Sequence, residues 1–138
     1  MSQEIRWQYR FANFRRAYVL LSEAFDDGVE VLNQLEREGV IQRFEYTFEL
    51  AWLTLKDRLE YDGVNLTTVT PRNVIREAFW AKLVSDGDAW IDMLTDRNLM
   101  SHTYDFDRFE AVIGRISDSY LPMLSDLYER FNRDVLES

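Results

Sequence analysis

Apolar residues recur along this chain at spacings of three and four, which is the period of one face of an α-helix. The first such stripe ends just before Asp26 and consists of Trp7, Phe11, Phe14, Tyr18, Leu21 and Phe25. A helix over this stretch places these side chains in a core. A further short helical piece is expected from Val29 to Arg37, with Gly39 closing it.

The widest apolar pattern runs from Ile41 to Tyr61. It holds two stripes, Ile41, Phe44, Phe48, Ala51, Trp52, Leu55 and Leu59, and Tyr46, Leu50 and Leu53. A helix apolar over so much of its circumference is buried on several sides, either at the centre of a bundle or at a dimer interface. Glu45 and Glu49 lie one turn apart within it. The sequence has no Glu-x-x-His to complete a carboxylate metal pair, so an ion-paired or solvated role is expected for both.

Turn signals divide the second half of the chain. Asp62-Gly63 ends the wide helix, residues 64–69 form a loop, and Thr70-Pro71 is a capping threonine followed by proline at the first helical position. Arg72 and Arg76 lie one turn apart on this next helix, either as a small anion-binding patch or as partners of nearby acids. Its expected apolar face is Val74, Ile75, Ala78, Phe79 and Leu83.

A helix capped by Asp88 should follow and stop between Ser101 and Tyr104, with Trp90, Ile91, Leu94 and Leu99 facing inward. The chain from 107 to 138 is mostly helical in pattern, and Pro122 predicts a kink near Tyr120 because proline lacks a backbone donor. These patterns predict an all-α, antiparallel bundle of about five helices. The wide apolar face and the many aromatic residues further predict a symmetric dimer.

Composition limits the possible classes of protein. A chain of 138 residues with 46% apolar residues fits a single globular domain over residues 1–138. Cysteine is absent, which excludes disulfides and thiolate catalysis. No apolar run is long enough to span a membrane and the first residues hold no signal region, so a cytoplasmic protein is expected. The net charge of −9 argues against broad nucleic-acid binding, although a local basic pocket remains compatible with it.

Candidate chemistry centres on the segment from Arg97 to Tyr104, which holds the only histidine, His102. Histidine titrates near physiological pH, and arginine offers a fork of donors that fits a phosphate. On a helix, however, Arg97 and His102 would lie roughly 140° apart, whereas Asn98 shares a face with His102 and Ser101 shares one with Arg97. The two groups therefore meet only if the helix ends near His102, if the arginine wraps round, or if a second copy contributes.

Three blocks of sequence resemble the HepT-like family, also called the nucleotidyltransferase substrate-binding protein family, within the HEPN superfamily. The similarity covers roughly Tyr9 to Tyr128. The blocks are Gln42–Trp52 with Leu55-Lys56-Asp57, then Thr70-Pro71-Arg72 with Ile75–Phe79, and finally Trp90, Met93-Leu94 and Asp96-Arg97-Asn98 through His102-Thr103-Tyr104.

The resemblance implies a dimer in which two Arg-x4-His motifs face each other across the interface. In the catalytic members this motif is that of a metal-independent endoribonuclease. His102 would then act as acid and base on the ribose 2′-hydroxyl or the leaving oxygen, Arg97 would hold the phosphate, and Asn98 would orient the motif or the substrate. The resemblance also implies a toxin–antitoxin pair with a small nucleotidyltransferase, which can adenylylate the motif tyrosine, here Tyr104.

Three hypotheses stay open from the sequence. The first is the ribonuclease toxin, with RNA as substrate. The second is a non-catalytic subunit that presents a nucleotide or another substrate to the transferase, which suits the acidic balance better. The third is a helical dimer in which Arg97 and His102 only satisfy an interface. Arg72, Arg76 and Ser101 are secondary candidates for binding, and no metal, cofactor or membrane partner is expected.

Overall fold

A computed structural model of the chain describes residues 2–103 and 105–138. The helices of this part are α1 (Gln3–Glu23), α2 (Gln34–Tyr61), α3 (Pro71–Trp80), α4 (Gly87–Met100), α5 (Phe106–Arg115) and α6 (Leu121–Glu137). A 3₁₀ turn, η1 (Val29–Val31), precedes α2, and a π-helical segment, η2 (Ile116–Tyr120), joins α5 to α6 without a gap. Counting α5, η2 and α6 as one, the described residues form five helical segments and no strand, which confirms the predicted all-α fold.

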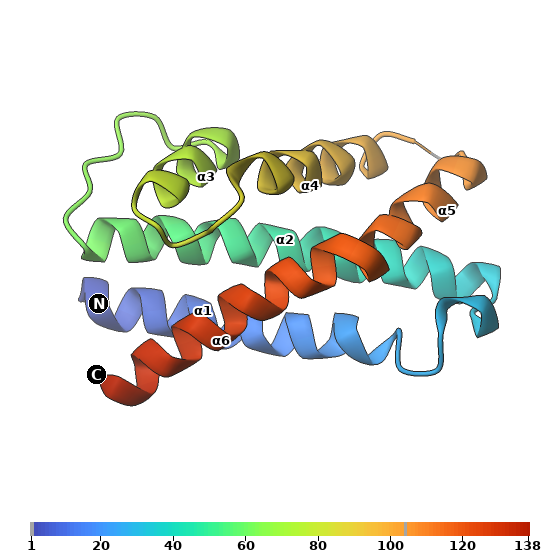
Figure 1. Ribbon diagram of the computed structural model, residues 1–138, viewed down its shortest axis with the longest axis horizontal. Helices are drawn as coiled ribbons and strands as arrows, with labels where there is room; N and C mark the ends of the chain where they lie inside the picture. Colours follow the sequence, from blue (N-terminus) through green and yellow to red (C-terminus); the bar gives the residue numbers. More distant parts are fainter. Residues whose placement is uncertain (1, 104) are drawn as a thin grey trace.

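Helix α2 is the centre of the bundle (Figure 1). It forms a long antiparallel hairpin with α1, while α3 and α4 follow each other along its opposite side and α6 crosses obliquely. Contacts of α2 with α1, α3, α4 and α5 explain why Phe44, Phe48, Leu55 and Leu59 are completely buried. Central burial therefore accounts for most of the apolar circumference of α2, although Tyr46 of its second stripe is exposed.

The start of α2 corrects one expectation from the sequence. The prediction of a separate short helix closed by Gly39 is wrong, because α2 begins at Gln34, seven residues before the predicted start at Ile41, with a capping box between Asn33 and Glu36. Gly39 lies inside α2 and does not end a helix. A Cβ at this position would meet nothing within 4 Å, so the packing does not require glycine there. Leu35, which lies within the stretch predicted as the short helix, is 77% exposed.

The other helix boundaries follow local chemistry. Gly63, with a φ of 89°, follows α2, and the Thr70 side chain accepts a hydrogen bond from the Asn73 backbone at 3.3 Å, as predicted. Helix α4 is capped by Asp86 and not by Asp88, because the Asp86 carboxylate accepts from the Ala89 backbone at 3.0 Å.

The break predicted near Pro122 takes the form of the π-helical segment η2, directly before α6. Proline cannot donate the helical hydrogen bond and its ring crowds the preceding turn, and a wider turn relieves both problems. The long C-terminal helix therefore continues through the interruption. The π-helical segment also places the Tyr120 hydroxyl next to Asp96 of α4.

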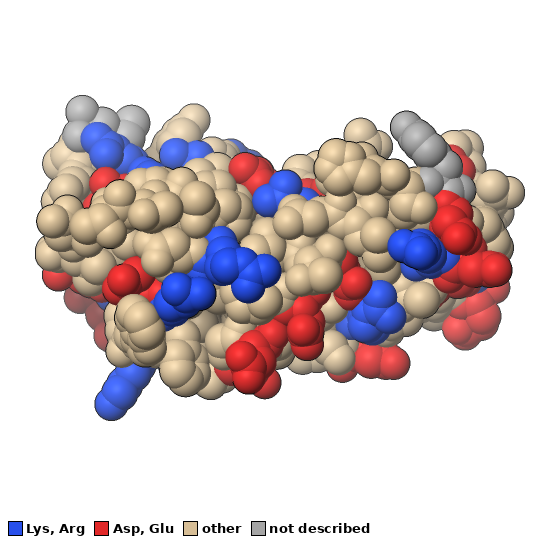
Figure 2. Space-filling model, turned by 90° about the horizontal axis from the view of Figure 1, so that it is seen from above, with Lys and Arg blue, Asp and Glu red and all other residues tan. Residues whose placement is uncertain are grey.

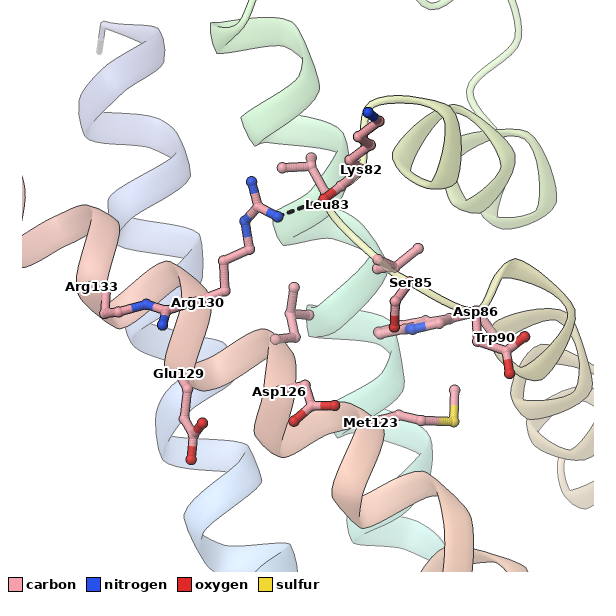
Figure 3. Close-up of a pocket in the computed structure, with 12 residues that line it drawn as sticks. Lys82, Leu83, Ser85, Asp86, Trp90, Met123, Asp126, Glu129, Arg130 and Arg133 are labelled. Atoms are coloured by element: carbon pink, nitrogen blue, oxygen red, sulfur yellow. Dashed lines mark hydrogen bonds between the residues drawn. The ribbon is translucent and has the colours of Figure 1, made fainter.

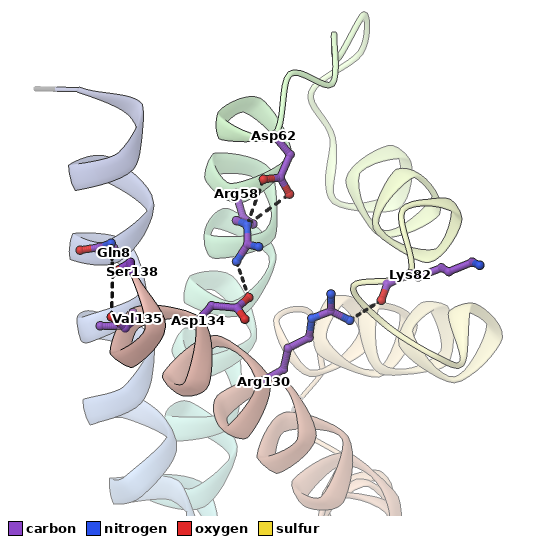
Figure 4. Close-up of polar contacts among 8 residues, drawn as sticks. All are labelled: Gln8, Arg58, Asp62, Lys82, Arg130, Asp134, Val135 and Ser138. Carbon is purple, nitrogen blue, oxygen red and sulfur yellow. Dashed lines mark hydrogen bonds and ion pairs between the residues drawn. The ribbon is translucent and has the colours of Figure 1, made fainter.

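Side-chain contacts tie α6 to the C-terminal part of α2 and to the turn before α4 (Figure 4). Arg130 donates to the backbone oxygen of Lys82 at 2.5 Å, which fixes a residue held in the left-handed region with a φ of 63°. Further along α6, Asp134 accepts from Arg58 of α2 at 2.7 Å, and Arg58 also bonds Asp62. The bond from Arg130 thus holds the turn that leads into α4 against α6. None of the helices among the described residues is both long and apolar enough to cross a membrane.

Candidate active site

Helix α4 ends where the sequence predicts. Its last residue is Met100, Ser101 is the C-cap, and the His102 backbone donates to the Leu99 carbonyl at 3.1 Å in a final turn. The side chains of Asn98 and His102 are exposed. The histidine is therefore available to solvent at a helix terminus, which satisfies one of the conditions under which it could act together with Arg97.

Tyr104 lies outside the described residues. Its neighbour Asp105 accepts from the Asp107 backbone at 2.9 Å and caps α5, so α5 begins two residues after the tyrosine. The described part of the motif thus begins in the last turn of α4 and ends in the short connection before α5.

Arg97 lies against α2. Its guanidinium carbon is 5.3 Å from the centre of the Phe48 ring, and its Nη2 atom is 3.1 Å from Oε2 of Glu49. Only 21% of the side chain is exposed, and its buried Nε has no hydrogen-bond partner among the described residues. The aromatic face and the carboxylate together hold the guanidinium in one orientation, with part of its donor fork left toward solvent.

Two carboxylates of α2 border the motif. Oε2 of Glu49 also accepts from the indole Nε1 of Trp52 at 3.0 Å, so a second contact fixes the group that holds Arg97. The hydroxyl of Ser101 lies 3.4 Å from Oε2 of Glu45 and 3.2 Å from the Arg97 carbonyl. The expected ion-paired role is confirmed for Glu49. No cluster of metal-ligating side chains is present in the described part of the chain.

The opposite side of α4 holds a group that the sequence analysis did not single out. Asp96, only 7% exposed, accepts from Nε of Arg115 at 2.7 Å and from its Nη2 at 2.9 Å, and also from the Tyr120 hydroxyl. Burial, together with the bond to Asp96, raises the pKa of Tyr120, and the same carboxylate raises the pKa of Arg115. The sequence signal that could have revealed Asp96 is its spacing. A carboxylate three residues after Met93 and four before Met100 falls within a stripe of buried side chains.

Arg72 and Arg76 are exposed and form no ion pair among the described residues, so pairing with nearby acids is not what the structure shows. They line a groove of about 540 Å³ at the start of α4 (the α3–α4 groove), whose other lining residues are Ile75, Phe79, Ser85, Asp86, Gly87, Asp88 and Ile91. Phe79, expected to face the core, is 44% exposed in this groove. The structure thus places these arginines at the opposite end of α4 from the motif.

A second hollow, of about 280 Å³, lies between the α3–α4 turn and α6 (Figure 3). Its charged lining is mixed in sign, with Arg130 and Arg133 next to Asp126 and Glu129. Arg130 is already bonded to the Lys82 carbonyl. The bond of Arg130 therefore indicates a structural contact between α6 and the turn.

Proteins of known structure share this fold. The chain is 33% identical to a protein of known structure from Thermus thermophilus, with a TM-score of 0.75 over 85% of this chain and 97% of that one. A Haemophilus influenzae structure, described as the fold of a substrate-binding domain of a nucleotidyltransferase, is 27% identical, with a TM-score of 0.66 over 95% of this chain and 99% of that one.

A third relative is a protein of Haemophilus influenzae named as a probable ribonuclease HepT. It is 29% identical over 113 residues, which are 78% of this chain and 77% of that protein. The family model described as "Nucleotidyltransferase substrate binding protein like" matches residues 9–133, nearly the range over which the sequence blocks indicate a resemblance. The chain therefore belongs to the nucleotidyltransferase substrate-binding protein-like family.

Proposed function

We propose that this protein is a HepT-like endoribonuclease that cleaves RNA without a metal ion. In this reaction His102 removes the proton from a ribose 2′-hydroxyl, whose oxygen attacks the neighbouring phosphorus. The bond from phosphorus to the 5′-oxygen breaks, and the leaving oxygen takes up the proton that the histidine has gained. Arg97 holds the phosphate as its charge develops, and Asn98 orients the strand or the histidine. The observation that supports this most is the exposed histidine beyond the end of α4, one turn after an exposed asparagine.

The proposed site is composite. Within one chain, Arg97 turns toward α2 while His102 lies past the helix end, and five residues of helix correspond to a rotation of about 140°. A second copy related by a two-fold axis brings an arginine and a histidine from different subunits to one phosphate. A homodimer is therefore part of the proposal.

A partner nucleotidyltransferase completes the proposed toxin–antitoxin pair. Adenylylation of Tyr104 adds a bulky, negatively charged group two residues from His102, which would repel an RNA strand and block the site. The family description and the Haemophilus influenzae structure both refer to a nucleotidyltransferase, which supports this choice of partner.

A second candidate function is a non-catalytic subunit that binds a nucleotide or another substrate for the transferase. Two observations favour it: the net charge of −9, and the fact that Arg97 is already paired with Glu49, which reduces the positive charge offered to an RNA strand. Such a subunit would bind a nucleotide without cleaving RNA.

Cleavage of a labelled RNA in the presence of a chelator tests the first function. We expect His102→Ala to lower the cleavage rate by roughly 10²–10⁴-fold, the contribution of general acid–base catalysis. Arg97→Ala should also lower it strongly, whereas Arg6→Ala, which removes an exposed arginine of α1, should change it little. Mass spectrometry confirms beforehand that Tyr104 is unmodified. Equal rates for the wild type and His102→Ala would reject the ribonuclease, and nucleotide binding by the same unmodified protein would then favour the second function.

A further inference from the structure

We propose that the α3–α4 groove is a binding site for single-stranded RNA, which it holds by a phosphate and a base and directs along α4 toward His102. This binding site deepens the proposed function. The direction of the strand toward His102 rests on the proposed ribonuclease. The site is distinct from the motif, because its cations come from α3 and it opens at the first turns of α4.

Two unpaired cations supply the phosphate contact. Arg72 and Arg76 stand one turn apart on the exposed side of α3 and have no ion-pair partner among the described residues, in a chain with 25 acidic and 16 basic residues. Two acids also line the groove: Asp86 accepts the capping bond from the Ala89 backbone, and Asp88 lies in the first turn of α4, where the helix dipole offsets its negative charge. Two guanidinium forks at this spacing can bind one or two phosphates of a flexible strand, and arginine is better suited to this than lysine.

An aromatic surface lies beside these cations. Phe79 is 44% exposed in the groove, and the neighbouring Trp80 is 64% exposed. Phe79 is held in position by close packing against Gly87, where an added Cβ would lie only 3.2 Å from its ring. Figure 2, which looks down on α3 and α4, shows blue and tan groups with several red ones over the left half of this face, and many red groups at its right end. Cations next to exposed rings are typical of sites where bases stack.

The groove leads toward the motif along one face of α4. Ile91, which lines the groove, is followed at helical spacing by Thr95 and Asn98, which share its face, and His102 follows just past the helix end. Thr95 and Asn98 are exposed, which leaves this face open. Seven residues of helix separate Ile91 from Asn98, which is about 10 Å along the axis. A strand that enters at Arg72 and Arg76 and passes Ile91 therefore reaches His102 after a length that corresponds to about three turns of helix.

The test measures binding of a fluorescein-labelled single-stranded RNA of about twelve nucleotides. All proteins carry His102→Ala, so the probe is not cleaved. We expect Arg72→Ala/Arg76→Ala to weaken binding by about tenfold or more, and to reduce the slope of log K against log salt by about 1.4, since each single-strand phosphate contact contributes about 0.7. The matched control is Arg15→Ala/Arg16→Ala, which removes the same charge from two exposed positions of α1, across α2 from the groove.

A second variant tests the aromatic contact. Phe79→Leu keeps apolar bulk against Gly87 but removes the stacking face, and it should weaken binding several-fold with an unchanged salt slope. Circular dichroism and Tm confirm that each variant is folded. Binding equal to that of the control pair, or no RNA binding by any protein, would overturn the proposal and leave the groove to a protein partner. RNA that binds through the groove but is never cleaved by the wild type would support the site while rejecting the ribonuclease.

Discussion

The last turns of α4 present two sides that are built differently. On the side toward α5 and η2, Asp96 is buried and held by Arg115 and by the Tyr120 hydroxyl. On the side toward α2, the very next residue, Arg97, has one ion pair with Glu49, in which the two side chains are 21% and 44% exposed. Neighbouring residues on one helix thus differ in how they are held: Asp96 is buried and accepts three hydrogen bonds, whereas the ion pair that orients Arg97 is partly exposed.

This difference indicates separate tasks for the two sides. The Asp96 network fixes the backbone of α4, and with it the place where the helix ends and His102 begins. The Glu49 contact only sets the direction of a side chain, and a partly exposed ion pair is weak enough for a phosphate to share or replace it. A site that must grip an anion needs a fixed backbone and an arginine that remains available. Substitutions on each side test this division, beginning with the largest effect.

Asp96→Ala should cause the largest loss of stability. It leaves the hydroxyl of Tyr120, a residue only 3% exposed, without its partner, and a buried group without a hydrogen bond costs about 1–3 kcal/mol. The Arg115 side chain is 47% exposed and can be rehydrated, so its share is small. We expect the free energy of unfolding in urea to fall by about 2 kcal/mol.

The control for this variant is Asp96→Asn, which keeps the volume and an oxygen acceptor for Tyr120. It should recover about half of the loss, because it removes the charge but not the hydrogen bond. A loss below about 0.5 kcal/mol for Asp96→Ala, which is the usual range for a surface substitution, would show that this side of α4 is not the rigid one.

Glu49→Ala should cost less, about 1 kcal/mol or below. An ion pair with this exposure contributes little, and the remaining loss comes from the indole of Trp52, which is 8% exposed and loses its acceptor. The main expected effect of Glu49→Ala is a change in the orientation of the Arg97 side chain, with only a small change in the free energy of unfolding. We expect the NMR resonances of the Trp52 indole N–H and the Arg97 Nε–H to shift clearly.

The matched controls for Glu49 separate charge from hydrogen bonding. Glu49→Gln keeps an oxygen for both donors and should leave the two resonances near their wild-type positions. Glu45→Ala removes the other α2 carboxylate, which contacts the motif through the Ser101 hydroxyl, and should leave both resonances unshifted. A loss from Glu49→Ala as large as that from Asp96→Ala would remove the distinction between the two sides.

The same comparison explains how far sequence reasoning reaches. Helix periods and capping residues are local signals, so the order of helices, the cap at Thr70 and the end of α4 were predictable. Local signals compete where several residues can cap, and Asp86 rather than Asp88 starts α4 for that reason. Contacts between distant segments leave no periodic trace. Asp96 with Arg115 is one such contact, and the pairing of Glu49 with Arg97 is another; both needed the fold to be recognised.

The smallest predicted effect is a pH dependence that arises from Tyr120. Burial raises its pKa in the folded protein, whereas in the unfolded chain it ionises near the ordinary value of about 10. Above that pH the folded state therefore binds more protons than the unfolded state, so stability falls as the pH rises. Urea unfolding at about pH 9 and pH 10.5 should show the wild type losing roughly 0.5 kcal/mol more than Tyr120→Phe, which cannot ionise there. Equal losses in the two proteins would mean that solvent reaches the hydroxyl and that the Asp96 side of α4 is as open as the Arg97 side.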